Sequence, residues 1–227
     1  MDNKTFFEKY GTALALLIGL VLIAGALMYG RGATMPTDGT GGEAVAVDIK
    51  DVKTEGSPFV GSADAPVTMA VWFDFQCSFC KAYESGTLTS VMTDYVADGK
   101  VRIVYKDFQF LGPASLETAL YSRAVWDAYP DKWGGWFNAV MTGGGESTLA
   151  RAGLDAAAVA QGMDAAQIAT LLTANKATYE AAIEADRAEG TTFGINGTPG
   201  SIVGTTLISG AQPYTMVKPL IDTELAK

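Results

Sequence analysis

The two cysteines of this chain, Cys77 and Cys80, stand two residues apart and directly follow the apolar run 67–75. That run is nearly continuous in apolar and β-prone residues, which is typical of a central strand buried on both faces. Over residues 79–96 apolar side chains recur at roughly helical spacing, and the pattern ends at Gly99. The sequence therefore predicts that the cysteine pair lies at the turn between a buried strand and a helix.

A cysteine pair can be a redox dithiol, half of a metal site or a structural staple. A structural zinc site takes about four cysteine or histidine ligands, whereas this chain has two cysteines and no histidine. Only carboxylates or a second subunit could complete such a site, so we predict no metal. The lack of histidine also excludes histidine acid–base chemistry. A staple across so small a loop adds little stability, because the entropic gain grows with loop length.

The start of a helix would suit Cys77 to nucleophilic chemistry. The reactive species is the thiolate, and the unpaired N–H groups and the dipole at a helix N-terminus stabilise an anion. Cys80 would lie on the same helical face and could close a small disulfide ring with Cys77. We therefore expect Cys77 to be the exposed attacking thiol and Cys80 the sheltered resolving thiol. No cofactor is predicted.

The charge of the chain argues against one class of partner. The formal net charge is -9 and the pI is about 4.5. Nonspecific binding to nucleic acids depends on basic patches that contact phosphates. We predict no nucleic-acid partner, and we interpret the acidity as a solvated surface.

Near the N-terminus, residues 11–30 form an uncharged stretch of 20 residues. A helix of this length spans roughly 30 Å, which matches one hydrocarbon core. Lys4 and Lys9 precede the stretch and Arg31 follows it, a weak bias that favours a cytoplasmic N-terminus. The alternative is a cleavable signal peptide with its cleavage site at Ala24-Gly25-Ala26.

We expect an uncleaved, single-pass membrane protein whose main domain lies outside the cytoplasm, where disulfides persist. The Gly- and Thr-rich segment after the apolar stretch is typical of a flexible tether. The expected organisation is a cytoplasmic N-terminus at 1–10, a transmembrane anchor at 11–30, a linker at 31–43 and the domain at 44–227.

The remaining elements alternate between strands and helices. We expect a short strand at 45–49, a second buried-face strand at 100–108, two short strands within 201–210 and a closing helix within 212–227. Residues 113–189 are Ala-rich and helical in pattern, with breaks at 129–135 and 142–145. Asp164 is the expected N-cap of the last of these helices. Four aromatic residues are expected in the core of this helical part: Trp126, Trp133, Trp136 and Phe137.

This order of elements, with Gly-Thr-Pro before the last strands, resembles the thioredoxin superfamily and, more closely, its DsbA-like branch. The resemblance lies in "FDFQCSFC" (73–80), "VYKDF" (104–108), "FGINGTPG" (193–200) and "ISGAQPY" (208–214), and it extends from about Val45 to the C-terminus. It implies an α/β thioredoxin fold with an α-helical subdomain inserted at about 111–190, preceded here by the transmembrane helix.

The resemblance also implies roles for particular residues. Cys77 and Cys80 would be the catalytic cysteines, and the dipeptide Ser78-Phe79 would tune the reduction potential. The peptide bond between Thr198 and Pro199 would be cis and would lie beside the cysteines, where the backbone of Thr198 could pair with an extended substrate.

Three positions qualify the resemblance. Asp74, three residues before Cys77, could handle protons or could cap the turn. Thioredoxins bury an acid where this chain has Val71. Gly200 follows the proline where relatives carry a β-prone residue, and we expect it to loosen the loop.

Together these features predict a membrane-tethered thiol–disulfide oxidoreductase that oxidises exported, cysteine-containing proteins. The resemblance implies reoxidation by a quinone-linked membrane partner of the DsbB or vitamin K epoxide reductase type. Two alternatives stay open. One is a disulfide reductase or isomerase on the same fold, since no histidine stands between the cysteines. The other is a noncatalytic peptide-binding domain whose CxxC is a structural staple.

Overall fold

The computed structural model describes residues 46–143 and 145–227, apart from the side chain of Glu146. The predicted cytoplasmic N-terminus, transmembrane anchor and linker lie outside the described residues. Within the described part of the chain, none of the helices combines the length and the apolar character that crossing a membrane requires.

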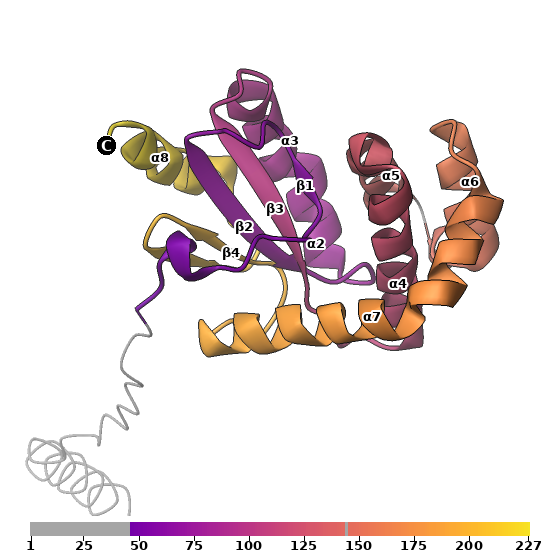
Figure 1. The fold of residues 1–227 in the computed structure, drawn as a ribbon. Helices are drawn as coiled ribbons and strands as arrows, with labels where there is room; N and C mark the ends of the chain where they lie inside the picture. Colours follow the sequence, from indigo (N-terminus) through magenta and orange to yellow (C-terminus); the bar gives the residue numbers. More distant parts are fainter. Residues whose placement is uncertain (1–45, 144) are drawn as a thin grey trace, which may run out of the picture. The chain divides into compact units, whose positions relative to one another are not determined.

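A five-stranded mixed sheet forms the centre of the domain (Figure 1). The strand order is β1-β3-β2-β4-β5, with β2 parallel to β3 and the other neighbours antiparallel. The strands are β1 (Phe59–Val60), β2 (Val67–Phe73), β3 (Val101–Asp107), β4 (Gly200–Val203) and β5 (Thr206–Ser209). The predicted strands at 67–75, 100–108 and 201–210 are confirmed.

Strand β2 is buried on both faces, as its apolar run predicts. Met69, Val71 and Phe73 join one core cluster, while Ala70 and Trp72 join a second cluster on the opposite face. Side chains alternate across a strand, so a strand with helices on both sides needs apolar residues throughout.

The prediction of a strand at 45–49 is wrong. Of this segment the structure describes residues 46–49, where a 3-10 turn, η1 (Ile49–Asp51), begins after its N-cap Asp48. Val47 is buried in the second core cluster, and the N–H of Ile49 donates to the carbonyl of Gly204 at 2.8 Å. The alternation of apolar residues in the sequence therefore reflects one docked turn and not a strand. The edge strand β1, too short to show a period, was not predicted.

The helix after the cysteines is continuous but irregular. It comprises α2 (Ser78–Tyr83), the π-helical turn η2 (Glu84–Leu88), α3 (Thr89–Val91) and a second π-helical turn, η3 (Met92–Val96). Gly86, expected to weaken or bend this helix, lies within η2. Together with α8 (Tyr214–Leu225), this helix packs on the sheet face of Met69 and Val71.

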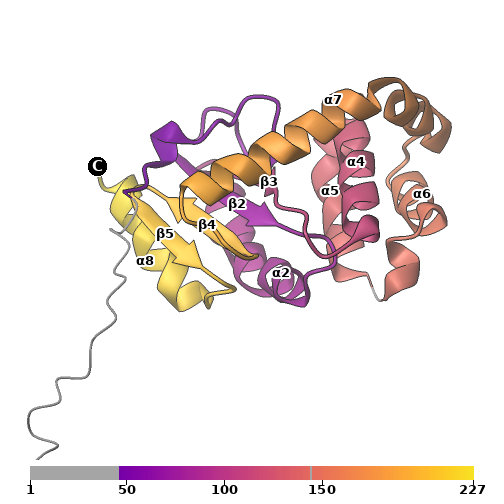
Figure 2. The same cartoon turned by 90° about the horizontal axis from the view of Figure 1, so that it is seen from below.

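Helices α4 to α7 lie between β3 and β4 and form the predicted helical insertion (Figures 1 and 2). They are α4 (Pro113–Ala128), α5 (Pro130–Thr142), α6 (Arg151–Ala160) and α7 (Ala165–Thr192), with a short 3-10 turn η4 (Glu146–Thr148) before α6. Asp164 caps α7 as predicted, its side chain accepting from the N–H of Ala166 at 2.8 Å. The predicted break at 129–135 occurs at its first residue, Tyr129, between α4 and α5, and α5 then continues through Gly134 and Gly135. The predicted break at 142–145 is confirmed, because α5 ends at Thr142.

The aromatic residues of α5 fasten this insertion to the sheet. Trp133, Trp136 and Phe137 are at most 1% exposed, which confirms their core assignment. The ring of Phe137 packs against those of Phe73 (5.0 Å between centroids) and Tyr105 (4.5 Å). The fourth predicted core residue, Trp126, is partly buried and packs against Phe59 of β1.

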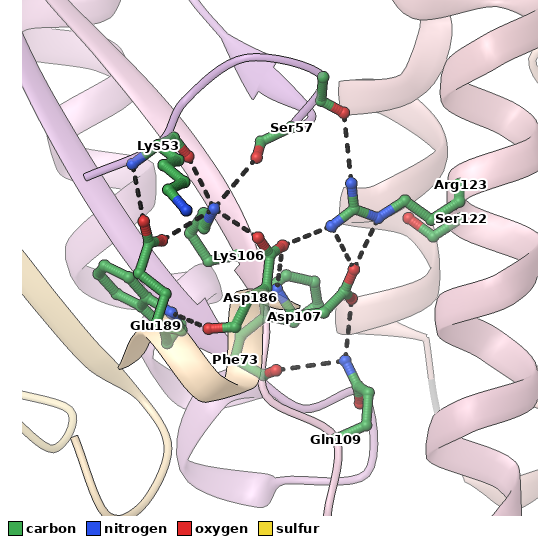
Figure 3. Close-up of polar contacts among 12 residues, drawn as sticks. Lys53, Ser57, Phe73, Lys106, Asp107, Gln109, Ser122, Arg123, Asp186 and Glu189 are labelled. Carbon is green, nitrogen blue, oxygen red and sulfur yellow. Dashed lines mark hydrogen bonds and ion pairs between the residues drawn. The ribbon is translucent and has the colours of Figure 1, made fainter. Parts of the chain in front are cut away.

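A buried cluster of charges joins α4 and α7 to β3 (Figure 3). Arg123 of α4 binds Asp107, with Nε at 2.8 Å from Oδ2, and also pairs with Asp186 of α7. Lys106 pairs with Asp186 and lies 3.0 Å from a carboxylate oxygen of Glu189. Burial raises the pKa of Asp107, and the adjacent Arg123 opposes that effect. Each buried carboxylate thus depends on a cation from another element.

Replacing Arg123 by Gln is expected to lower the free energy of unfolding by about 3–5 kcal/mol, because Asp107 and Asp186 lose a buried partner. The matched control is Arg151→Gln, which removes a half-exposed ion pair with Asp155 and should cost less than about 1 kcal/mol. Denaturant unfolding of both variants measures the difference. Equal losses would show that the buried cluster does not hold the insertion.

Candidate active site

Cys77 is the N-cap of α2, in the extended conformation typical of that position (φ -71°, ψ 116°). Its N–H donates to the carbonyl of Asp74 at 3.1 Å, and its own carbonyl accepts from the N–H of Lys81 at 3.1 Å. These two bonds fix the turn and aim the first N–H groups of the helix at the sulfur. The side chain is 7% exposed, so Cys77 is less open to solvent than expected from the sequence.

The proline loop lies beside Cys77, although it is 121 residues away in the chain. The peptide bond between Thr198 and Pro199 is cis, which is the geometry that the resemblance implies. The thiol of Cys77 donates to the carbonyl oxygen of Thr198 at 3.3 Å. The buried hydroxyl of Thr198 has no hydrogen-bond partner among the described residues. The structure therefore brings together all four residues that motif spacing linked: Cys77, Cys80, Thr198 and Pro199.

The two cysteines are not bonded to each other, and their environments push their acidities in opposite directions. The pKa of Cys77 is lowered to about 5, and the largest cause is a hydrogen bond from the Cys80 side chain. Burial opposes this shift. The Thr198 side chain and the backbone N–H groups of Cys80 and Phe79 lower the pKa further. Burial raises the pKa of Cys80 well above its usual range, and the nearby Cys77 sulfur raises it further. At neutral pH the pair thus holds one thiolate, on Cys77, and one thiol, on Cys80.

Ser78 and Phe79 face solvent rather than the core. Both are exposed, and the Phe79 side chain is 67% exposed. Their direct contribution to the thiolate is through backbone geometry, since the N–H of Phe79 contributes to lowering the pKa of Cys77.

Asp74 organises the turn before Cys77. Its buried carboxylate accepts from the N–H groups of Gln76 (2.8 Å), Phe110 (2.9 Å) and Leu111 (3.1 Å), and from the hydroxyl of Ser115 (2.5 Å). Within the described part of the chain, it makes no hydrogen bond to either cysteine sulfur. Its contacts favour capping of the turn over proton handling, and they tie this turn to the segment between β3 and α4.

Gly200 begins β4 and pairs with Trp72 on one side and Ser209 on the other. A Cβ atom here would lie 2.8 Å from the side chain of Ile195. The glycine therefore allows Ile195 to pack against the start of the strand. It is held in the sheet on both sides rather than loosened.

Glu84 is a buried acid that the sequence reasoning missed. It is 2% exposed; the hydroxyl of Tyr105 donates to its Oε2 at 3.2 Å, and its Oε1 has no partner among the described residues. Burial raises the pKa of Glu84 to about 7, and the bond from Tyr105 partly counteracts the shift. A signal was available, because position 84 is one turn after Cys80 on the face that also buries Leu88 and Val91. The buried carboxyl thus comes from the helix, while Val71 fills the strand position.

Among residues 46–143 and 145–227, no group of three or more His, Cys, Asp or Glu side chains could hold a metal ion.

Comparison with protein families finds one model, described as thioredoxin, that matches residues 53–223. The chain is 34% identical over 77 residues to disulfide bond formation protein D of Bacillus subtilis, covering 34% of this chain and 35% of that protein. It is 30% identical over 67 residues to the probable disulfide bond formation protein D of Bacillus cereus, covering 30% and 31%. These alignments span about a third of the curated relatives.

Solved structures share the fold more widely. The oxidised crystal structure of BdbD from Bacillus subtilis matches with a TM-score of 0.71 at 24% identity, over 81% of this chain and 99% of that chain. The thiol-disulfide exchange protein α-DsbA2 from Wolbachia pipientis matches with a TM-score of 0.65 at 23% identity, over 74% and 86%. A thioredoxin fold with a helical insertion is therefore confirmed.

The raised pKa of Glu84 predicts a specific dependence of stability on pH. The Glu84 carboxyl ionises near pH 4.3 in the unfolded chain but near pH 7 in the folded protein. The contribution of this group to stability is therefore full below about pH 4.3 and is lost as the pH rises through about 7. Relative to the wild type, Glu84→Gln should gain roughly 2–3 kcal/mol in unfolding free energy between about pH 5 and pH 8. Denaturant unfolding at both pH values measures this gain.

The control is Glu55→Gln, which changes an exposed acid and should alter stability equally at both pH values. A Glu84→Gln variant whose stability follows the wild type at all pH values would show that Glu84 ionises normally.

Proposed function

Because this chain belongs to the thioredoxin family, we propose that it is a protein thiol–disulfide oxidoreductase that forms disulfides in exported proteins through Cys77 and Cys80. The observation that carries the proposal is the division of labour between the two sulfurs. Cys77, beside the cis-proline loop, has a pKa of about 5, whereas the pKa of the more buried Cys80 is raised. A structural staple would require no such difference.

In the oxidising direction the cycle starts from the Cys77–Cys80 disulfide. A substrate thiolate attacks the sulfur of Cys77, a mixed disulfide forms, and Cys80 leaves as a thiolate that takes up a proton because its pKa is high. A second substrate thiolate then attacks the substrate sulfur of the mixed disulfide and expels Cys77. The Cys77 thiolate is a good leaving group because leaving ability increases as thiol pKa falls. The substrate gains a disulfide, and the enzyme is left as the dithiol.

The same pKa supports the oxidising direction of electron flow. The lowered pKa of Cys77 stabilises the folded, reduced protein; the effect is complete above the ordinary thiol pKa of about 8.5 and is lost as pH falls through about 5. The disulfide form has no thiolate to stabilise, so the disulfide is comparatively easy to donate. This favours oxidase over reductase or isomerase activity.

We further propose the setting in which this activity occurs. Residues 11–30 would anchor the chain in the cell membrane, residues 31–43 would link the anchor to the domain at 44–227, and that domain would act outside the cytoplasm. The reduced dithiol must return its electrons to an oxidant, and a quinone-linked membrane protein of the DsbB or vitamin K epoxide reductase type is the proposed partner. The names of the Bacillus relatives, disulfide bond formation protein D, support the disulfide-forming activity that this setting would serve.

Replacing Cys80 by Ala should convert the protein into a trap. In this variant the Cys77 thiolate can still attack a disulfide of a substrate protein, which bonds one substrate sulfur to Cys77 and releases the other as a thiolate. Without the Cys80 thiol this mixed disulfide is not resolved, so mixed disulfides should accumulate in cells and should be visible on non-reducing gels. Cys77→Ala is the matched control and should trap nothing. Trapping that is absent from Cys80→Ala, or equal in the two variants, would contradict the mechanism and favour a noncatalytic peptide-binding domain.

A further inference from the structure

A groove of about 620 Å³ lies between the N-terminal end of α4 and the C-terminal half of α7. Phe110, Pro113, Leu116 and Ile183 supply apolar walls, and three charged side chains of α7 line it as well: Glu180, Glu184 and Arg187. We call this feature the α4–α7 groove. Figure 2 shows α4 and α7 meeting at the side of the domain that carries the insertion. An apolar trough with a few charged groups is the usual form of a site for a side chain.

The α4–α7 groove is attached to the turn that carries Cys77. Gln76, next to Cys77 in the chain, accepts hydrogen bonds at its Oε1 from the N–H (3.1 Å) and the hydroxyl (2.9 Å) of Ser115. A Cβ atom on Gly112, which lines the groove, would lie 3.6 Å from the same oxygen. The N–H of Phe110 donates to Asp74. The segment that lines the groove is therefore held in a fixed position relative to the active-site turn.

Large apolar side chains remain open to solvent at this wall. Phe110 is 48% exposed, Leu111 44% and Leu116 38%, although large apolar side chains of this kind are usually buried. Rigid backbone contacts to Asp74 hold Phe110 and Leu111 in these positions. Exposed apolar residues on a rigid frame are typical of a surface that another chain covers.

The charged residues of the groove indicate which side chains a bound polypeptide would carry. Glu184 is exposed and has no ion pair within the described residues, and Glu180 makes only a 3.7 Å contact with Lys176. Of the charged groups that line the groove, two are acidic and one is basic, and Glu184 is the acid that has no ion pair among the described residues. A lysine or arginine would complement it, and an acidic residue would be repelled.

We propose that the α4–α7 groove binds the segment of a protein substrate next to its reactive cysteine and selects a bulky apolar residue accompanied by lysine or arginine. This inference rests on the proposed function, because the cysteine must first reach Cys77. The apolar residue packs against Phe110, Leu116 and Ile183, and the cation lies against Glu184. The groove thereby makes Cys77 exchange preferentially with substrate cysteines that have such flanking residues, whereas the thiol chemistry alone would accept any exposed cysteine.

The test measures exchange at Cys77 in the full chain carrying Cys80→Ala. A mixed disulfide of Cys77 with glutathione reacts with a peptide thiol; the peptide sulfur becomes bonded to Cys77, and glutathione leaves as its thiol. Each test peptide contains one cysteine and one residue pair: Leu-Lys, Leu-Glu or Ser-Lys. The pair stands about two to six residues before or after the cysteine. Because an extended chain rises about 3.3 Å per residue, this range varies the distance between the cysteine and the pair. The equilibrium constant of each exchange is the readout.

We expect Leu-Lys peptides to be favoured over Leu-Glu by about fivefold and over Ser-Lys by about tenfold at the best spacing. Glu184→Gln should remove the first preference, and Leu116→Ser should remove the second. The matched controls are Glu55→Gln and Val159→Ser, which change an exposed acid and a 60% exposed apolar residue outside the groove. Both preferences should persist in the controls.

The outcomes separate the two proposals. Failure of Cys77 to form any mixed disulfide with glutathione would overturn the proposed function. Normal exchange with glutathione but equal constants for the three peptides would overturn the groove inference alone. Preferences that survive both Glu184→Gln and Leu116→Ser would place substrate selection on another surface and would likewise overturn it.

Discussion

The active site depends on holding one negative charge, the Cys77 thiolate, at a position that is almost shielded from water. Burial alone would keep this sulfur protonated. The start of α2 supplies N–H groups, Cys80 supplies a thiol hydrogen bond, and the Thr198 side chain on the proline loop contributes as well; together they bring the pKa of Cys77 to about 5. The N–H groups and the Cys80 thiol belong to α2, whereas Thr198 belongs to the proline loop, so the chemistry requires the helix and the distant loop to be assembled accurately.

Two polar networks maintain that assembly. Asp74 joins the turn before Cys77 to residues 110–115, and the buried cluster around Arg123, Lys106 and Asp186 joins the helical insertion to β3. The indole N–H of Trp72 also donates to the carbonyl of Asp186, at 2.9 Å. The insertion is thus fixed to the strands that position the cysteines, and its helices α4 and α7 form the α4–α7 groove.

Much of this architecture could be predicted, because many of its elements are determined by residues that are close together in the sequence. The apolar run of β2, the N-cap Asp164 and the CxxC turn each follow from short-range pattern and chemistry. The rest depends on long-range pairing. The two-residue strand β1 has no period of its own, the turn at Ile49 mimics strand alternation, and the burial of Lys106 and Asp107 becomes possible only because α4 and α7 bring opposite charges to them. Glu84 escaped notice because a lone acid in a helix usually faces solvent.

The reduction potential of the Cys77–Cys80 pair as a function of pH tests the central claim most directly. With Cys77 ionised above about pH 5, reduction of the disulfide takes up two electrons and one proton, so the potential should fall by about 30 mV per pH unit between pH 6 and 8. At pH 7 it should be well above the thioredoxin value of about -270 mV. A slope of about 60 mV per pH unit over that range, with a potential near that of thioredoxin, would contradict the account.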